Sequence, residues 1–321
     1  MSRFCDTIID RCAQPLLLPA WVRQNYPIPG EYMSSDTQNS QAMNEILIKE
    51  ERLLVVDDIL GWEKARQVAV DYKVKAMGMF SQLLFRPKPD DITIVYEEKR
   101  YQAFWHIVGT LFLDYKRKTR HRVPVETMVK TNTIEGKEYQ VNQADHTFEI
   151  EGIEHCQEAQ REELLVDAQT EKPGDFARYM RSSSKQIENM DILTQDGAQV
   201  VYLKAKASFL IRQVLNKLVR PYKADEILEE RIAIEELNLY FYPLYTFEFV
   251  WANKDKKALV EFDGVTGEAR KGLKISDQLL QSFSYDEMFD FAKEIAGFVP
   301  GGGLAMMTGR KAYQIVKKTK F

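Results

Sequence analysis

The chain has 321 residues, of which 45% are hydrophobic and 29% are charged, and its net charge is −4. This ordinary globular composition excludes a chain that is disordered throughout, and the length favours about two domains. Three cysteines are too few, and odd in number, for a secreted disulfide scaffold. The sequence shows no signal-peptide pattern and no run of roughly 18 apolar residues that could span a membrane. We therefore expect a cytoplasmic protein, with attachment at the membrane periphery as the alternative.

The N-terminal part, residues 1–45, is predicted to be an arm. Its prolines, Pro15, Pro19, Pro27 and Pro29, interrupt any helix. Regular structure is expected to begin near Ile46.

Residues 62–85 carry apolar residues at three- and four-residue steps, a pattern that predicts a helix with one apolar face. The members of this face are Ala65, Val68, Ala69, Tyr72, Ala76, Met79, Phe80, Leu83 and Leu84. Pro87 should end the helix, because the residue before a proline is pushed toward extended geometry.

Most of the following segments have the β-branched and aromatic residues typical of strands. Strands are predicted over 92–96, 104–115, 122–129, 129–134, 138–141 and 148–153, with Gly136 in a hairpin turn. The polar stretch 168–198 is predicted to be a linker. Beyond it, the pattern predicts a helix over 200–219, a strand over 237–251, and a hairpin whose strands, 258–262 and 268–270, flank a glycine-containing turn. Residues 257–268 resemble the closing strand pair of PepSY-type domains, a match too short to imply a family.

Two stretches follow the same order of elements. In each, a helix ends at an Arg-Pro pair, at Arg86 and at Arg220, and an acidic pair and an aromatic strand follow. Two such units could bury their apolar faces against each other. The fold class predicted from this pattern is α+β: two related helix-plus-antiparallel-sheet units, 46–167 and 199–275, followed by a C-terminal helical hairpin over 276–321. A chance resemblance between two ordinary α+β segments is the alternative.

The letters of a metal-dependent nuclease motif occur at Asp90, Glu97 and Lys99. Two carboxylates could hold Mg²⁺ while the lysine steadies developing charge. However, an extended segment would place the two acids about 20 Å apart, at roughly 3.3 Å per residue. We therefore expect charges at the two ends of a strand, and we predict no metal site and no cofactor. A metal-dependent enzyme that cleaves phosphodiesters remains an alternative function.

The densest basic run lies at residues 116–122. Its cations are Lys116, Arg117, Lys118, Arg120 and Arg122. At a hairpin tip they could bind phosphates, which makes nucleic-acid binding a further alternative. A solvated turn is the simpler interpretation.

The C-terminal segment carries the leading functional prediction. A second helix is predicted to start near Leu304, with apolar residues on one side and cations on the other. The residues predicted to contact a partner are Arg310, Lys311, Tyr313, Lys317 and Lys318. Either this helix packs on the protein's own core, or it docks on a protein partner or an anionic membrane surface. On this basis we predict a non-enzymatic interaction or adaptor protein.

Overall fold

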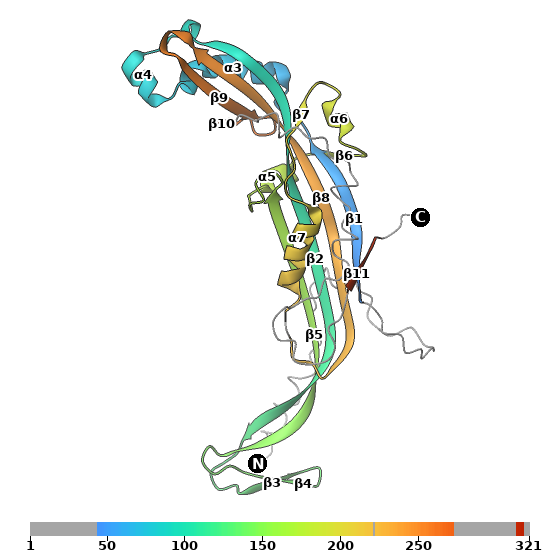
Figure 1. Ribbon diagram of the computed structural model, residues 1–321. Helices are drawn as coiled ribbons and strands as arrows, with labels where there is room; N and C mark the ends of the chain where they lie inside the picture. Colours follow the sequence, from blue (N-terminus) through green and yellow to red (C-terminus); the bar gives the residue numbers. More distant parts are fainter. Residues whose placement is uncertain (1–43, 221, 273–312, 318–321) are drawn as a thin grey trace. The chain divides into compact units, whose positions relative to one another are not determined.

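The computed structural model describes residues 44–220, 222–272 and 313–317 (Figure 1). The chain divides into two units, residues 1–42 and 43–321, and every described residue belongs to the second. Among these residues, no helix is long and apolar enough to cross a membrane.

The described elements are mostly strands. The strands are β1 (Asn44–Val56), β2 (Thr93–Pro124), β3 (Thr131–Ile134), β4 (Lys137–Gln140), β5 (Thr147–Asp167), β6 (Ser184–Ile187), β7 (Gln199–Val200), β8 (Glu226–Trp251), β9 (Lys256–Asp263), β10 (Ala269–Lys271) and β11 (Tyr313–Lys317). The helices are α3 (Trp62–Ala76), α4 (Met79–Phe85), α5 (Ala177–Arg181), α6 (Asp191–Thr194) and α7 (Ala207–Leu218), with short 3₁₀ turns at Pro89–Asp91 and Ala252–Lys254.

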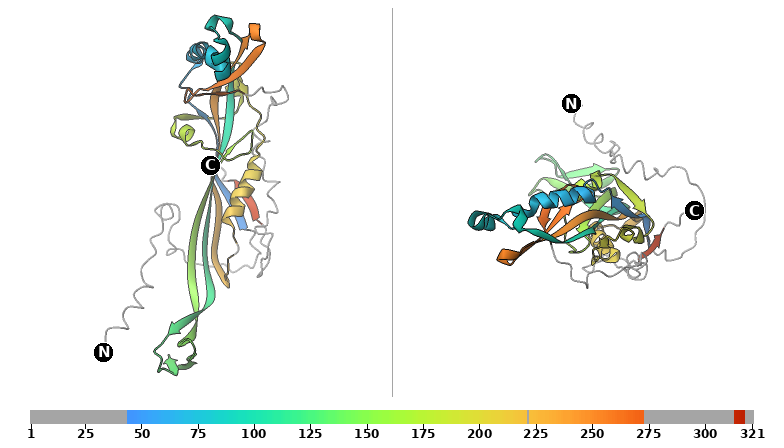
Figure 2. Two further views of the ribbon diagram at one scale, coloured as in Figure 1. Left: turned by 90° about the vertical axis from the view of Figure 1, so that its left-hand side faces the viewer. Right: turned by 90° about the horizontal axis from the view of Figure 1, so that it is seen from above.

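One large mixed sheet contains all these strands except the β3–β4 hairpin (Figures 1 and 2). β8 is the central strand. One of its edges pairs with β2 in antiparallel fashion. The other edge pairs with β1 in parallel along residues 232–241 of β8, and with β9 along residues 244–251. β2 also pairs with β5 through the whole length of β5. Residues 102–113 of β2 are all buried, as expected for a strand that is covered on both faces.

Three apolar clusters fill the described part of the fold. The largest lies between α7 and the sheet, where Gly109 on β2 allows the helix to approach closely. A second lies under α3 and includes Phe247, Phe249 and Phe262. The third is aromatic, and Phe104 stacks between Phe176 and Tyr240 in it.

The predicted duplication of helix-plus-sheet units is wrong. The two aromatic strands that were assigned to separate units are partners in a single ladder, with Phe104 opposite Tyr240. The protein is mostly β, built on one sheet. The two segments resemble each other because each supplies a central strand, and central strands favour aromatic and β-branched residues.

The predicted C-terminal helical hairpin is wrong as well. Residues 313–317, which were assigned to its second helix, form strand β11 and pair in parallel with β1. The edge of β1 offers backbone hydrogen bonds to this segment, and the adjacent β-branched residues Ile315 and Val316 favour a strand. The remaining residues of the predicted hairpin, 276–312 and 318–321, lie outside the described residues.

Several local predictions are confirmed. The β3–β4 hairpin turns at Gly136, which has φ of +79°. β9 and β10 flank the predicted turn, where Gly267 has φ of +74°. The helix predicted over 200–219 is observed as α7, and the strand predicted over 237–251 is the second half of β8.

Candidate docking surface

The helix predicted over 62–85 is interrupted at Gly78, whose φ of +83° turns the chain between α3 and α4. Ala65 and Ala69 of α3, which belong to the predicted apolar face, are buried against the sheet. The prediction of a single helix over 62–85 is therefore wrong, and α4 exposes the residues of the apolar face that follow Gly78. Glycine is suited to this turn, since it adopts positive φ without steric cost.

The orientation of α4 is reversed relative to an ordinary surface helix. Its apolar side chains are between 53% and 82% exposed, whereas the side chain of Ser81 is buried. We call the exposed residues the α4 patch: Met79, Phe80, Leu83, Leu84 and Phe85. A helix that packs on its own core would show the opposite distribution.

Polar contacts hold α4 in this orientation. The ammonium of Lys256, at the start of β9, donates to the carbonyl of Met77 over 2.6 Å and to the hydroxyl of Ser81. The side-chain amide of Gln82 donates to the carbonyl of Val74 over 3.3 Å. The polar side of α4 therefore faces α3 and β9, which leaves the apolar side exposed.

The C-terminal end of α4 is also held. The ring of Phe85 meets the ring of Trp251 edge-on, with centroids 6.2 Å apart. The ammonium of Lys254 lies 4.4 Å from the centroid of the Phe85 ring, a cation–π distance. Phe85 thus bridges α4 and the turn between β8 and β9.

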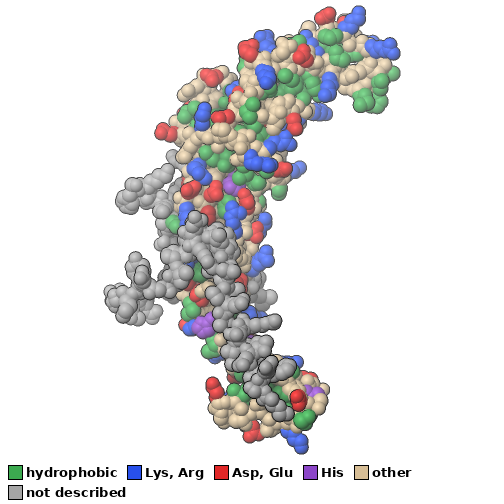
Figure 3. All heavy atoms as spheres, turned by 180° about the vertical axis from the view of Figure 1, so that it is seen from behind, with side chains coloured by type: hydrophobic (Ala, Val, Ile, Leu, Met, Phe, Trp, Pro, Cys, Tyr) green, Lys and Arg blue, Asp and Glu red, His purple; other side chains and the backbone are tan. Residues whose placement is uncertain are grey.

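The surroundings of the α4 patch are basic. Residues 72–89 contain four cations, Lys73, Lys75, Arg86 and Lys88, and no acidic residue, and aspartates flank this range at 71, 90 and 91. The turn between β8 and β9 together with the first residues of β9, residues 252–258, adds three lysines and one aspartate. In Figure 3 hydrophobic side chains gather at the upper right end of the molecule, with Lys and Arg side chains around them.

The basic run at 116–122 lies along β2, and carboxylates on neighbouring strands face its cations. The nitrogen–oxygen distances are 2.9 Å for Lys116–Glu226, 2.5 Å for Arg117–Glu154, 3.4 Å for Arg120–Glu151 and 3.2 Å for Arg122–Glu149. The backbone N–H of Lys118 donates to the carboxylate of Asp225. These pairs offset much of the positive charge that suggested phosphate binding.

The residues of the nuclease-like motif have separate surroundings. Glu97 pairs with Arg66 over 3.2 Å, and Lys99 pairs with Asp58 over 3.0 Å. Asp90 lies in the 3₁₀ turn before β2. Within the described ranges, no group of three or more His, Cys, Asp or Glu residues is arranged to hold a metal ion.

The residues predicted at the C-terminus are only partly described. Tyr313 and Lys317 are the first and last residues of β11, opposite Asn44 and Ile48 of β1. Arg310, Lys311 and Lys318 lie outside the described residues.

The class of protein that these observations define is a mixed β-sheet protein with an exposed apolar helix set among cations. The chain matches no protein-family model, and searches of curated proteins and of solved structures found no significant match.

Proposed function

We propose that the protein is a non-enzymatic interaction protein that docks on an anionic membrane surface through the α4 patch. The observation that carries this proposal is the reversed orientation of α4, which directs five apolar side chains to solvent. We do not propose the C-terminal segment as the docking element, because residues 313–317 form a strand of the sheet and not the predicted helix.

The apolar side chains supply the first part of the binding energy. Burying one Leu or Phe side chain is favourable by roughly 1.5–3 kcal/mol, so even partial burial of several residues is significant. Contiguous exposed apolar side chains of this kind usually mark an interaction site.

The cations supply the second part and favour a membrane over a protein partner. Each Lys or Arg near an anionic leaflet contributes about 1 kcal/mol of attraction. The acid-free segment 72–89 places such cations on both sides of the apolar side chains. A short helix that exposes its apolar residues next to basic flanks is suited to lie at the boundary between headgroups and acyl chains.

Co-sedimentation of the full chain with vesicles tests this proposal. The wild-type protein should sediment with vesicles of phosphatidylcholine mixed with phosphatidylserine, more weakly with phosphatidylcholine alone, and more weakly at high salt. The double variant Phe80→Glu with Leu84→Glu should weaken binding at least about tenfold. Met128→Glu is the matched control, because Met128 is 76% exposed but lies in the segment between β2 and β3.

The proposal fails if the wild-type chain does not bind anionic vesicles, or if the double variant binds them as well as Met128→Glu does. It also fails if light scattering shows that the wild-type chain self-associates through α4 and that the monomer has no affinity for vesicles. The α4 patch would then be an interface between copies of the chain.

A further inference from the structure

The outer side of α7 forms a basic surface. The side of the helix that packs on the sheet is apolar and buried, and it includes Leu210, Val214 and Leu218. The exposed side covers about 140° of the helix, at roughly 100° per residue. We call this side, together with the arginine that follows the helix, the α7 face. Its members, all exposed except the half-buried Gln213, are Phe209, Arg212, Gln213, Asn216, Lys217 and Arg220.

The segment that contains α7 is free of acidic residues. Residues 197–224 carry six cations and no aspartate or glutamate, and Asp196 and Asp225 lie directly outside this range. In the whole chain, by contrast, 48 acidic residues outnumber 44 lysines and arginines. Positive charge is therefore concentrated at α7 in a protein that is acidic overall.

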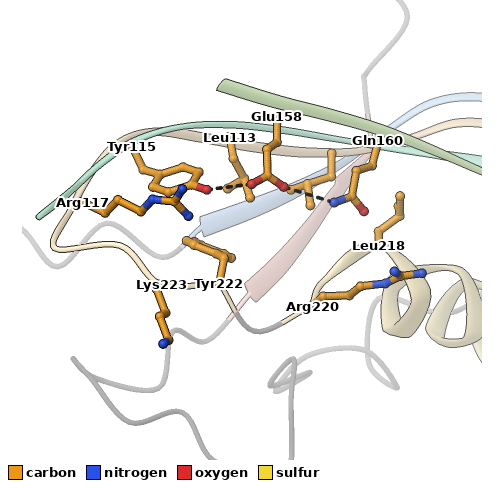
Figure 4. A pocket seen from close by; sticks show the side chains of 10 residues that line it. Leu113, Tyr115, Arg117, Glu158, Gln160, Leu218, Arg220, Tyr222 and Lys223 are labelled. Carbon is orange, nitrogen blue, oxygen red and sulfur yellow. Dashed lines mark hydrogen bonds between the residues drawn. The ribbon is translucent and has the colours of Figure 1, made fainter. Parts of the chain in front are cut away.

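Two arginines of the α7 face have no acidic partner among the described residues. These are Arg212 and Arg220, and the Nε of Arg220 donates to the carbonyl of Lys217 over 3.2 Å. Figure 4 shows the guanidinium of Arg220 directed away from Glu158, and both oxygens of that carboxylate accept hydrogen bonds from other side chains. The basic run at 116–122 differs, because carboxylates face its cations.

The lysines near α7 do have carboxylates within reach. The ammonium of Lys217 lies 3.9 Å from the carboxylate of Glu162, and the two side chains are 52% and 30% exposed. An exposed pair at this distance contributes little, so Lys217 can exchange it for an anionic ligand. Lys204 pairs with Glu171 over 2.8 Å and is not part of the α7 face.

Phe209 places an aromatic ring among these cations. It is 51% exposed, and it lies three residues before Arg212, so the two side chains are neighbours on the helix surface. Gln213 and Asn216 add amide donors and acceptors beside them. An exposed ring among cations and amides is typical of surfaces that bind unpaired nucleotides, because the ring can stack on a base while the cations contact phosphates.

We infer that the α7 face binds single-stranded nucleic acid: Phe209 stacks on a base, and Arg212 and Arg220 contact phosphates. Lys217 supplies a third phosphate contact. This surface is distinct from the α4 patch, and the inference goes beyond the proposed membrane docking. A membrane suits the α7 face less, because the face offers one large apolar side chain where the α4 patch offers five. A duplex suits it less as well, since paired and stacked bases leave no free base for the ring.

Fluorescence anisotropy of the full chain with a labelled oligothymidylate of about 12 nucleotides tests this inference. The wild type should bind at low salt, with a slope of about −2 in log K against log salt for three phosphate contacts. Arg212→Gln with Arg220→Gln should lower the affinity at least about tenfold and bring the slope to about −0.7. Phe209→Ala should lower the affinity about tenfold and leave the slope unchanged, because it removes stacking but no charge.

Arg120→Gln with Arg122→Gln is the matched control, because it removes two arginines that are each 69% exposed and lie outside α7. This control should bind the oligonucleotide as the wild type does, and so should the α4 variant Phe80→Glu with Leu84→Glu. A failure of membrane docking would therefore leave this test intact.

The inference is overturned if the wild type does not bind the oligonucleotide, or if the control loses as much affinity as the arginine variant. An equally tight complex with a duplex of the same length, or an unchanged affinity in Phe209→Ala, would exclude the stacked base. Polyglutamate that competes as well as unlabelled oligothymidylate would assign the α7 face to an acidic protein instead. Loss of vesicle binding in the arginine variant, with oligonucleotide binding intact, would assign it to the membrane contact.

Discussion

The ammonium of Lys256 donates a hydrogen bond to the hydroxyl of Ser81, and the same ammonium reaches the carbonyl of Met77. These contacts connect the first residue of β9 to the buried side of α4 and to the residue before Gly78. The position of the exposed α4 patch thus depends on a lysine that is 175 residues further along the chain.

Replacing Lys256 with Met should loosen α4. The substitution removes both hydrogen bonds and leaves the carbonyl of Met77 and the hydroxyl of Ser81 without this donor, at a cost of about 1–2 kcal/mol in the free energy of unfolding. Chemical denaturation measures that cost, and hydrogen exchange over residues 79–85 should become faster. Lys257→Met is the control, because Lys257 is exposed and adjacent; equal effects of the two variants would contradict the assigned role.

Arg100 should be far more important for stability than the exposed cations of the same strand. Its side chain is 5% exposed and pairs with Glu98 over 2.6 Å and with Glu261 over 3.6 Å. Arg100→Met would leave the buried carboxylate of Glu98 without its cation, whereas Glu261 keeps Arg270 at 2.9 Å, and the substitution should cost about 3–5 kcal/mol.

Arg120→Met is the comparison for Arg100→Met, because the side chain of Arg120 is 69% exposed. It should change the free energy of unfolding by less than about 1 kcal/mol. Urea denaturation of both variants measures the difference, and similar losses would mean that the buried pairs contribute no more than the exposed ones.

Gly109 should tolerate no larger side chain. A Cβ at this position would lie 2.5 Å from Cγ1 of Val214 and 2.9 Å from Cδ1 of Leu218, so α7 would have to move away from β2. Gly109→Ala should destabilise the protein by about 1–3 kcal/mol.

The variant Val214→Ala removes the atom that meets the new methyl group at Gly109. The cost of Gly109→Ala should therefore be smaller in the Val214→Ala background than in the wild type. Additive effects of the two substitutions, measured by thermal or chemical unfolding, would show that the close approach of α7 is not the cause.

The contact between His106 and Glu163 should make stability depend on pH. Burial acts to raise the pKa of Glu163, but the hydrogen bond to His106 Nε2 at 2.8 Å and the one from Arg161 outweigh it, so the pKa is lowered. Because the pKa of Glu163 is lower in the folded state, its ionised carboxylate stabilises the fold at pH values above the unfolded-state pKa of about 4.3. This stabilisation is lost as the pH falls through the folded-state pKa.

The variant Glu163→Gln tests that dependence. At neutral pH it should be less stable than the wild type by about 1 kcal/mol, since the side chain is partly exposed, and the difference should shrink in acid. Unfolding curves from neutral pH to below pH 4 follow the change. Glu236 is a second acid near this histidine among the described residues, 3.8 Å from Nδ1, so Glu236→Gln shows whether the effect is specific to Glu163.

The sequence contains residues that mark α4 as a separate short helix, although the helical periodicity continues through them. Gly78 and Pro87 bracket a segment of only seven helical residues with five large apolar side chains. Periodicity alone suggested one long helix with one apolar face, because it assigns residues to faces but does not locate a break. The position of Lys256 decides which side of α4 is held inward, and that residue is remote in sequence.

Local chemistry in the sequence determined the hairpin turns at Gly136 and Gly267, the helix that became α7, and the strand character of 237–251, because short-range sterics and side-chain spacing govern these features. Only the tertiary structure decided that β2 and β8 are partners, that residues 313–317 join the edge of β1, and that α4 turns its apolar side outward. Strand pairing and the direction of a helix depend on contacts between distant residues, and no local pattern encodes which distant residue will supply them.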